Sequence, residues 1–162
     1  MKIVSGGQTG VDRGALEAAR KSGVETGGFA PKGYLTERGF DLALKEFNLV
    51  DSGKSYFERT NLNALNSDGT IWFGGMSNTP GYAATKQACQ QAGKIFLNIS
   101  RIPPEDAALM IKSHDWVIIN VAGPRESVSQ GIQAKSEKYI VAMIRELKTR
   151  FASLFEFSEY EP

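Results

Sequence analysis

The sequence predicts an α/β protein with a mainly parallel sheet of about five strands and helices on both faces. Three short apolar runs, at 70–73, 95–99 and 116–121, show no alternation, which is typical of strands buried on both faces. Helical segments at 81–91 and 104–112 separate these runs, and strands that alternate with helices form parallel sheets. The predicted architecture is therefore Rossmann-like and doubly wound, with the strand order left open.

The chain opens with a short apolar strand that runs directly into a glycine-rich turn and a helix. Gly6, Gly7 and Gly10 remove side chains that would keep a ligand away from the backbone. The first amides of the helix, which is expected to begin near Gly10, lack intrahelical partners. This arrangement is typical of a phosphate-binding loop. No Lys-Ser or Lys-Thr follows the glycines, so the alternative is a tight turn in which Gly10 and Gly14 let the helix lie close to the sheet.

Other segments complete the predicted fold. Gly23 is expected to end the first helix, and residues 26–31 form a second short strand and the loop after it. The mixed, polar stretch at 32–57, with a helical turn expected around 42–47, is a long connection. In a compact domain such a connection is more often a functional lid than a linker. A long final helix is expected at 129–150, and the aromatic residues of 151–162 either pack onto the domain or form a dimer contact.

Composition and charge narrow the class of protein. A chain of 162 residues fits one domain, 1–162, with a buried core that needs no disulfide or metal. The net charge is +1 and no cluster of Lys and Arg is interleaved with aromatic residues, so no nucleic-acid partner is expected. No apolar run approaches the roughly 20 residues of a membrane span, and the N-terminus reads as a strand rather than a signal peptide. These features predict a cytoplasmic protein with no membrane partner.

Cysteine and histidine are too few to build a metal site. One Cys and one His exclude a zinc cluster of these residues, and no protein-bound metal is expected. Cys89 falls in a helical stretch, where a small buried residue is favoured over a nucleophile. His114 precedes a strand and so belongs to the edge of the sheet away from the usual ligand site, which argues against a Ser-His-Asp triad.

Three glycine-bearing loops are expected to meet at one edge of the sheet. They are 6–13, 74–81 and 122–127, and each follows a predicted strand. Because the carboxyl ends of parallel strands share an edge where ligands bind, their convergence favours a site for a phosphorylated small molecule. The guanidinium groups of Arg13 and Arg125 should contribute more than the helix dipole, about 1.5 to 3 kcal/mol against about 0.3 to 1 kcal/mol.

The candidate ligand-binding residues lie in or beside these loops, and none is assigned a catalytic role. They are Gly6, Gly7, Gln8, Thr9, Gly10, Asp12, Arg13, Arg59, Gly74, Gly75, Thr79, Gly81, Thr85, Gly123, Pro124, Arg125, Glu126 and Ser127.

Several of these residues have a structural alternative. Thr9 and Asp12 have the spacing of a capping box, although Asp12 could also contact a ribose, a ring nitrogen or a metal-bound water. Arg13 could point into solvent. Glu126 could be an acid or base, but a surface ion pair is favoured. Arg59 could reach the ligand from the long connection.

Four sequence segments occur in order along most of the chain. They are S-G-G-Q-T-G-V-D-R-G-A-L at 5–16, R-T-x-x-N at 59–63, S-D-G-T at 67–70 and N-V-A-G-P-R-E-S at 120–127, followed by Gly131-Ile132. In these segments the sequence resembles the molybdenum (molybdopterin) cofactor carrier family. This family belongs to a Rossmann-like group that includes the lysine-decarboxylase-like phosphoribohydrolases and nucleotide-sensing modules. The resemblance implies a site for a phosphorylated pterin or a nucleotide at the three loops.

Two departures bear on activity. The phosphoribohydrolases carry P-G-G-x-G-T-x-x-E in the second loop, whereas this chain has G-G-M-S-N-T-P-G-Y-A-A-T at 74–85 and lacks the helix-borne glutamate. Tyr82 also stands where Gly-Thr is common. A non-catalytic carrier of molybdopterin cofactor is therefore preferred. A sensor of an NAD-derived or ADP-ribose-like nucleotide, in which the C-terminal aromatic segment mediates homo-oligomer assembly, and a nucleotide hydrolase with Asp12 or Glu126 as base are the alternatives.

Overall fold

The computed structural model describes residues 1–152 and contains a six-stranded parallel sheet in the order β5-β2-β1-β8-β6-β7. The strands are β1 (Lys2–Val4), β2 (Glu25–Ala30), β5 (Leu49–Asp51), β6 (Gly69–Trp72), β7 (Ile95–Asn98) and β8 (Ile118–Ala122). The predicted Rossmann-like fold is confirmed, with β5 as the strand beyond the expected five. β7 differs from its prediction as a strand buried on both faces, because it forms one edge of the sheet and leaves Ile95 42% exposed.

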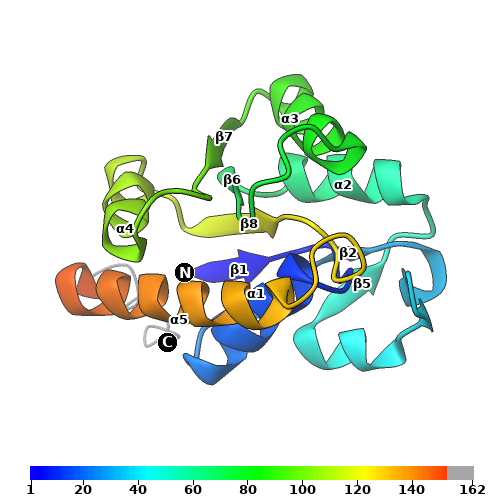
Figure 1. Cartoon of the computed structure of the whole chain (residues 1–162), viewed down its shortest axis with the longest axis horizontal. Coiled ribbons are helices and arrows are strands. Elements are labelled where there is room, and N and C mark those ends of the chain that lie inside the picture. The colour runs from blue at the N-terminus through cyan, green and yellow to red at the C-terminus, as the bar shows by residue number, and fades with distance from the viewer. Residues whose placement is uncertain (153–162) are drawn as a thin grey trace, which may run out of the picture.

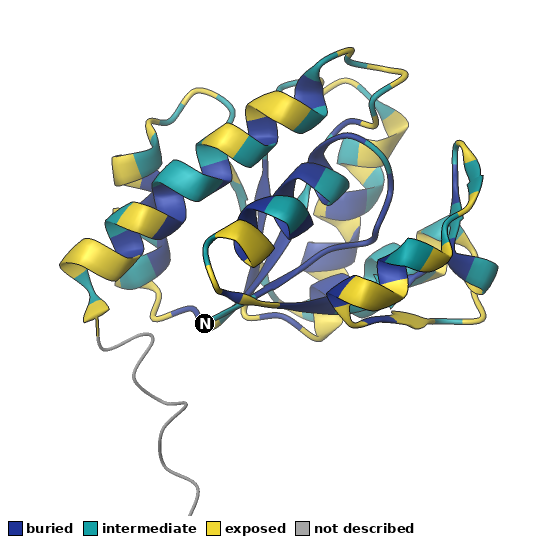
Figure 2. Ribbon diagram, turned by 90° about the horizontal axis from the view of Figure 1, so that it is seen from below, coloured by how far each residue is buried: buried dark blue, intermediate teal, exposed yellow. Residues whose placement is uncertain are grey.

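Helices cover both faces of this sheet (Figure 1). They are α1 (Val11–Lys21), α2 (Tyr56–Leu65), α3 (Pro80–Ala92), α4 (Pro104–Ser113) and α5 (Ile132–Arg150). Helices α1, α4 and α5 lie on one face, and α2 and α3 lie on the other. The buried residues of α1 and α5 face the sheet, whereas their exposed residues face outward (Figure 2).

The main core fills the space between the sheet and the helices α1, α4 and α5. Ile3, Ile71 and Ile119, from three neighbouring strands, are fully buried against Met143 and Ile144 of α5. Each such side chain contributes about 1.5–3 kcal/mol by leaving water. This packing fixes the strands whose carboxyl ends carry the three loops.

The stretch at 32–57 has the expected helical turn around 42–47, which is the 3-10 helix η2 (Leu42–Phe47), and further elements that the sequence did not predict. These are the 3-10 helix η1 (Lys32–Tyr34), the antiparallel hairpin of β3 (Leu35–Thr36) and β4 (Gly39–Phe40), and strand β5. Helix α2 follows and starts with a capping box in which Ser55 and Glu58 satisfy each other's backbone amides. This helix places Arg59 above the end of β1.

β8, the last strand among residues 1–152, lies in the middle of the sheet. β8 pairs with β1 on one side and with β6 on the other. The loops that follow β1, β6 and β8 are therefore neighbours, and the strand order changes direction at this point. The predicted convergence of the three loops agrees with this order of strands.

Gly10, just before α1, and Gly14 within it permit close approaches. A Cβ on Gly10 would lie 2.4 Å from the carbonyl oxygen of Pro124, and a Cβ on Gly14 would lie 2.1 Å from the Oγ of Ser136 in α5. Both glycines thus allow close packing, but against the third loop and α5 and not against the sheet, as the alternative predicted.

The substitution Gly14→Ala should destabilise the fold. The added methyl group meets the backbone of α5 as well, since a Cβ lies 2.5 Å from the carbonyl oxygen of Gln133, and overpacking of this kind lowers stability by about 1–3 kcal/mol. Urea denaturation measures the free energy of unfolding. Gly81→Ala is the control, because its Cβ would first meet an atom at 3.9 Å, and it should change stability by less than about 0.5 kcal/mol. Equal stability of the two variants would refute this account of α1 packing.

Candidate functional site

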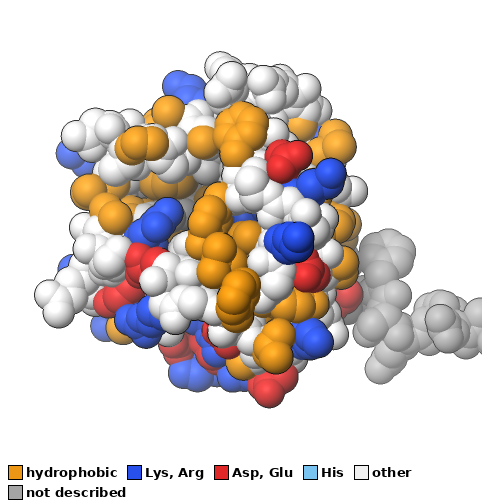
Figure 3. Space-filling model, turned by 90° about the vertical axis from the view of Figure 1, so that its right-hand side faces the viewer, with side chains coloured by type: hydrophobic (Ala, Val, Ile, Leu, Met, Phe, Trp, Pro, Cys, Tyr) orange, Lys and Arg blue, Asp and Glu red, His pale blue; other side chains and the backbone are white. Residues whose placement is uncertain are grey.

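A cavity of about 540 Å³ opens at the carboxyl edge of the sheet. Helix α2, the first turns of α3 and the loop after β8 form its walls, and Gln8 and Asp12 form its floor. Figure 3 looks onto this edge, where apolar side chains lie among Lys and Arg side chains. The volume falls within the range typical of small-molecule and cofactor sites, about 300–1,000 Å³.

Ten of the predicted residues line this cavity. They are Gln8, Asp12, Arg59, Thr79, Gly81, Thr85, Gly123, Pro124, Arg125 and Ser127. Their position agrees with a shared site, and their role in binding stays a prediction. Eight predicted residues do not line it, namely Gly6, Gly7, Thr9, Gly10, Arg13, Gly74, Gly75 and Glu126.

A buried ion pair joins α2 to the first loop. Nη1 of Arg59 lies 3.5 Å from Oδ2 of Asp12, and the two side chains are 12% and 7% exposed. The guanidinium also lies directly on the backbone of Gly6, where a Cβ would be 1.5 Å from Nη1. Burial raises the pKa of Asp12 and lowers the pKa of Arg59, while the attraction between the two charges opposes both shifts. The arginine is therefore part of the cavity floor.

Two buried donors at this floor have no hydrogen-bond partner among residues 1–152. They are Nε2 of Gln8 and Nε of Arg59. The amide of Gln8 is oriented by its oxygen, which accepts hydrogen bonds from the backbone amides of Thr9 at 3.0 Å and Glu37 at 2.9 Å. Its nitrogen must therefore donate elsewhere. Buried donors without partners carry a free-energy penalty, and an acceptor group of a ligand would remove it once a small movement opens these nitrogens to the cavity.

Aromatic and apolar side chains form another part of the wall. Tyr56, Phe57 and Trp72 line the cavity together with Val128. The guanidinium carbons of Arg59 and Arg125 each lie 5.9 Å from the centre of the Tyr56 ring. Cationic donors thus lie next to an aromatic surface on which a flat ring can stack.

The first turn of α1 is not an open anion site, contrary to the sequence-based expectation. The backbone amide of Val11 donates to the carbonyl oxygen of Pro124 at 3.1 Å, and that of Arg13 donates to the carbonyl oxygen of Gln8 at 3.1 Å. The third loop covers this helix end because Gly10 has no side chain to prevent it. The candidate anion donors are therefore side chains of the cavity.

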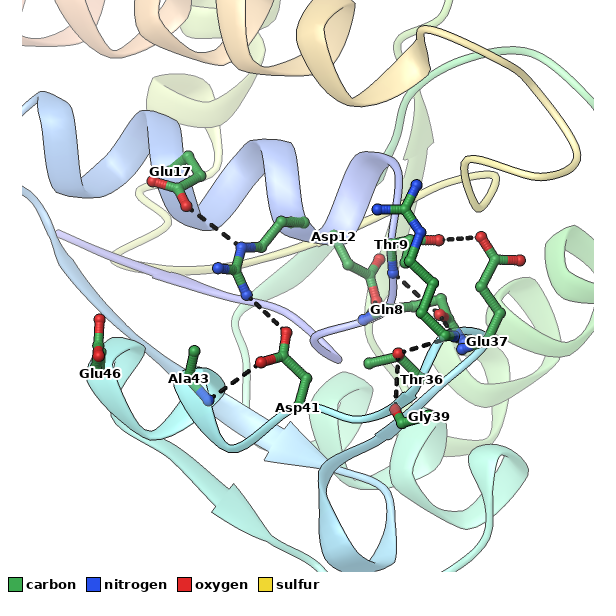
Figure 4. Close-up of polar contacts among 12 residues, drawn as sticks. Gln8, Thr9, Asp12, Glu17, Thr36, Glu37, Gly39, Asp41, Ala43 and Glu46 are labelled. Atoms are coloured by element: carbon green, nitrogen blue, oxygen red, sulfur yellow. Dashed lines mark hydrogen bonds and ion pairs between the residues drawn. The ribbon is translucent and has the colours of Figure 1, made fainter.

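Two charged residues of the loops are engaged elsewhere. Arg13 pairs with Glu17 at 3.3 Å and with Asp41 at 3.1 Å, so it does not simply point into solvent (Figure 4). Glu126 accepts hydrogen bonds from the backbone amides of Gly131 and Gln133 at the start of α5, so the expected surface ion pair is wrong.

The capping-box alternative for Thr9 and Asp12 is also wrong. Thr9 donates to Glu37, and Asp12 accepts from the backbone amide of Gln8 at 3.2 Å. Gly10 precedes the helix, which has no side-chain cap.

The sequence did not single out three residues of this region. Tyr56 and Trp72 line the cavity. Glu37, at the tip of the β3–β4 hairpin, accepts hydrogen bonds from Ser127 and from Thr9, and Figure 4 shows the contact with Thr9. Trp72 lies near the carboxyl end of a predicted strand. In a parallel sheet, residues at this position often line the ligand site. Glu37 belongs to no motif, and its role depends on the path of the hairpin.

Cys89 and His114, which the sequence predicts to be structural, make contacts within the fold, and so does Asp68. Cys89 is buried, and burial raises the pKa of its thiol. His114 stacks on Trp116 with ring centres 5.4 Å apart. Asp68 accepts from the backbone amides of Val117 and Ile118 at the amino edge, at 2.8 and 2.7 Å.

No group of three or more His, Cys, Asp or Glu that could hold a metal ion occurs within residues 1–152. Within the same range, no helix has the length and apolar character needed to cross a membrane. Of the aromatic segment 151–162, Phe151 packs against the main core, and residues 153–162 lie outside the part that the structure describes.

The parallel sheet, its strand order and the cavity at its carboxyl edge define a Rossmann-like α/β protein. The chain belongs to the circularly permutated YpsA SLOG family, whose sequence profile matches residues 3–144. It is similar to the crystal structure of a "putative molybdenum carrier protein" from Syntrophus aciditrophicus SB, with 36% identity, a TM-score of 0.75, and coverage of 90% of this chain and 92% of that one. A search of curated proteins gave no match. The resemblance drawn from the sequence is confirmed.

Arg59→Met should lower the stability of the protein, mainly because it breaks the buried ion pair with Asp12. Removing one partner of a buried pair destabilises a protein by about 3–5 kcal/mol, because the other charge stays buried. Arg59 lowers the pKa of Asp12, so the variant raises that pKa further above the ordinary value of 3.8. The folded state then holds a proton that the unfolded state has released, and the loss of stability should be larger at pH 8 than at pH 5.

Urea denaturation of Arg59→Met at both pH values measures this effect. The double variant Asp12→Asn with Arg59→Met is the control, and it should recover part of the loss because no buried carboxylate remains. Equal losses at both pH values, without recovery in the double variant, would contradict the importance of the pair.

Glu37 should stabilise the protein only when it is ionised. Burial acts to raise its pKa, but hydrogen bonds from Ser127 and Thr9 and the charge of Arg125 outweigh burial and hold the pKa below 4.5. The contribution is therefore complete above pH 4.5 and is lost as the pH falls through the lower folded pKa. The difference in unfolding free energy between the wild type and Glu37→Gln should shrink from pH 7 to pH 3. A constant difference would exclude this role.

Proposed function

We propose that the cavity binds a phosphorylated small molecule with a flat heteroaromatic ring, and that this ligand is molybdopterin cofactor. The observation that carries the proposal is the pair of buried donors without partners, Nε2 of Gln8 and Nε of Arg59, at the cavity floor. Phosphate oxygens are strong acceptors for amide and guanidinium donors. Arg125, whose side chain is 44% exposed, adds a second guanidinium on the solvent side.

The ring of the ligand would lie against the aromatic wall. Tyr56 and Trp72 offer flat surfaces, and the edge of Trp72 is fixed because its Nε1 donates to the carbonyl oxygen of Gly75 at 2.6 Å. Trp72 also packs edge-on against Tyr82, with ring centres 5.1 Å apart. A wall held in this way is preorganised, which lowers the entropy lost on binding.

The choice of a pterin over a nucleotide follows from the similar structure, which is described as a molybdenum carrier. Both ligands offer a flat ring and a phosphate to the same donors. In the proposed binding mode this chain holds the organic part of the cofactor through its phosphate and ring, and any molybdenum remains bound to the cofactor. A nucleotide ligand would instead favour a sensor.

Native mass spectrometry of the freshly purified protein, followed by denaturation, identifies any small molecule that is released. Released molybdopterin supports the carrier proposal, and a released adenine nucleotide supports the sensor. If none is released, calorimetric titration with molybdopterin, AMP and ADP-ribose is the second measurement. Failure to bind any of these phosphorylated compounds overturns the proposal. Turnover of a nucleotide that Asp12→Asn abolishes would instead make the protein an enzyme.

Arg125→Ala should weaken binding of the ligand identified in this way. Loss of a charge-assisted hydrogen bond reduces the binding free energy by about 1.5–3 kcal/mol, which corresponds to an affinity lower by about tenfold or more. Calorimetric titration measures the dissociation constant. Arg145→Ala is the charge-matched control, because Arg145 is exposed on α5 and does not line the cavity. Unchanged affinity in Arg125→Ala would remove Arg125 from the site.

A further inference from the structure

The carboxylate of Glu37 is bound by the same loops that are proposed to bind a phosphate. Oε1 accepts from the hydroxyl of Thr9 and from the backbone amide of Ser127 at 3.1 Å, and Oε2 accepts from the hydroxyl of Ser127. Nε of Arg125 lies 4.0 Å from Oε2. The Glu37 side chain is only 13% exposed. An internal anion thus occupies donors of the first and third loops, and Figure 4 shows the contact with Thr9 of the first loop.

Glu37 reaches these donors from outside the cavity. Ser127 and Arg125 line the cavity, whereas Glu37 lies with Arg38 and Gln130 in a hollow on the other side of Ser127. The hydroxyl of Ser127 has a single proton to donate. A phosphate in the cavity and the carboxylate of Glu37 cannot both receive it, and two negative charges so close repel each other.

The segment that carries Glu37 is suited to local opening. The strands β3 and β4 pair only through Leu35 with Phe40 and Thr36 with Gly39. The Phe40 side chain is 74% exposed, so apolar packing does not anchor this end of the hairpin. Segments with little buried apolar contact open at a lower free energy than the core.

We propose that Glu37 is an internal competitor for the phosphate group of the ligand. In the free protein its carboxylate occupies the hydroxyl of Ser127 beside Arg125, two residues that line the cavity, and the hairpin 35–40 is released when a phosphate in the cavity takes this hydroxyl. The backbone amide of Glu37 also holds the side chain of Gln8, so release of the hairpin changes the cavity floor. This inference rests on the proposed function. It adds a gate, which is the hairpin 35–40 that opens when a phosphate displaces Glu37.

Calorimetric titration with inorganic pyrophosphate tests the competition. Glu37→Gln removes the charge and keeps the size of the side chain, and Glu37→Ala also removes the acceptors. Both variants should bind pyrophosphate about tenfold more tightly than the wild type, because a charge-assisted interaction no longer has to be broken. Glu25→Gln is the charge-matched control, since Glu25 pairs with Lys2 at the start of β2 and its side chain is 64% exposed. Its affinity should equal that of the wild type.

The outcomes separate the gate from the binding site. If the wild type binds pyrophosphate and Glu37→Gln binds it no more tightly, Glu37 supports the site and the gate is overturned while the proposed function stands. If none of the four proteins binds pyrophosphate, the anion site fails, and the gate fails with it. A melting curve shows whether each variant is folded, and Glu37→Gln carries the test if Glu37→Ala is not.

Hydrogen–deuterium exchange supplies a readout that a purely supporting role would not give. Saturating pyrophosphate should increase exchange of the backbone amides at 35–40 in the wild type, because the hairpin loses its hold on the first and third loops. Slower exchange in this segment would overturn the gate even if the affinities change as expected.

Discussion

The close approach of the first and third loops determines where this protein can hold a ligand. Gly10 allows the carbonyl oxygen of Pro124 to reach the start of α1, where it accepts the hydrogen bond of Val11. A helix end that would otherwise attract an anion is thereby satisfied within the protein. The available donors are displaced toward α2 and the loop after β8, and the cavity lies there.

The positions of the charged groups in the cavity also follow from the covering of this helix end. With the helix end covered, Arg59 from α2 occupies the space above Gly6 and forms the buried pair with Asp12. A pair of this kind is not by itself a source of stability, because both ions lose their hydration. Its value lies in holding a guanidinium at a fixed place with one donor, Nε, still to be satisfied. The site thus combines a fixed cation on its floor with Arg125, a more exposed cation, near its mouth.

The sequence predicts the parts of this molecule that depend on local pattern. The apolar runs at 70–73 and 116–121 contain most of strands β6 and β8, and the glycine-rich turns mark the three loops around the cavity. β5 was not predicted, because it has only three residues, two of them exposed, and forms no apolar run. Helix α2 was missed although its capping-box spacing was present in the sequence.

The site was less predictable because it depends on pairings distant in the chain. Arg59 faces Asp12 only because α2 crosses above β1, and Glu37 meets Ser127 across 90 residues. Neither residue pair produces a sequence motif of short spacing. Gly10 was recognised as a point of close approach, but the sequence could not distinguish an approaching ligand from an approaching loop.

The central position of β8 also governs how the protein can be made. During synthesis β1 and β6 emerge long before residues 118–122, and until then neither has the neighbour that joins them. The nascent chain carries two half-sheets with exposed inner edges, which are open to pairing with other chains. The cavity cannot form at this stage because its third loop has not yet been synthesised. The ligand site therefore forms only when β8 joins the two halves of the sheet, so ligand binding is coupled to completion of the fold.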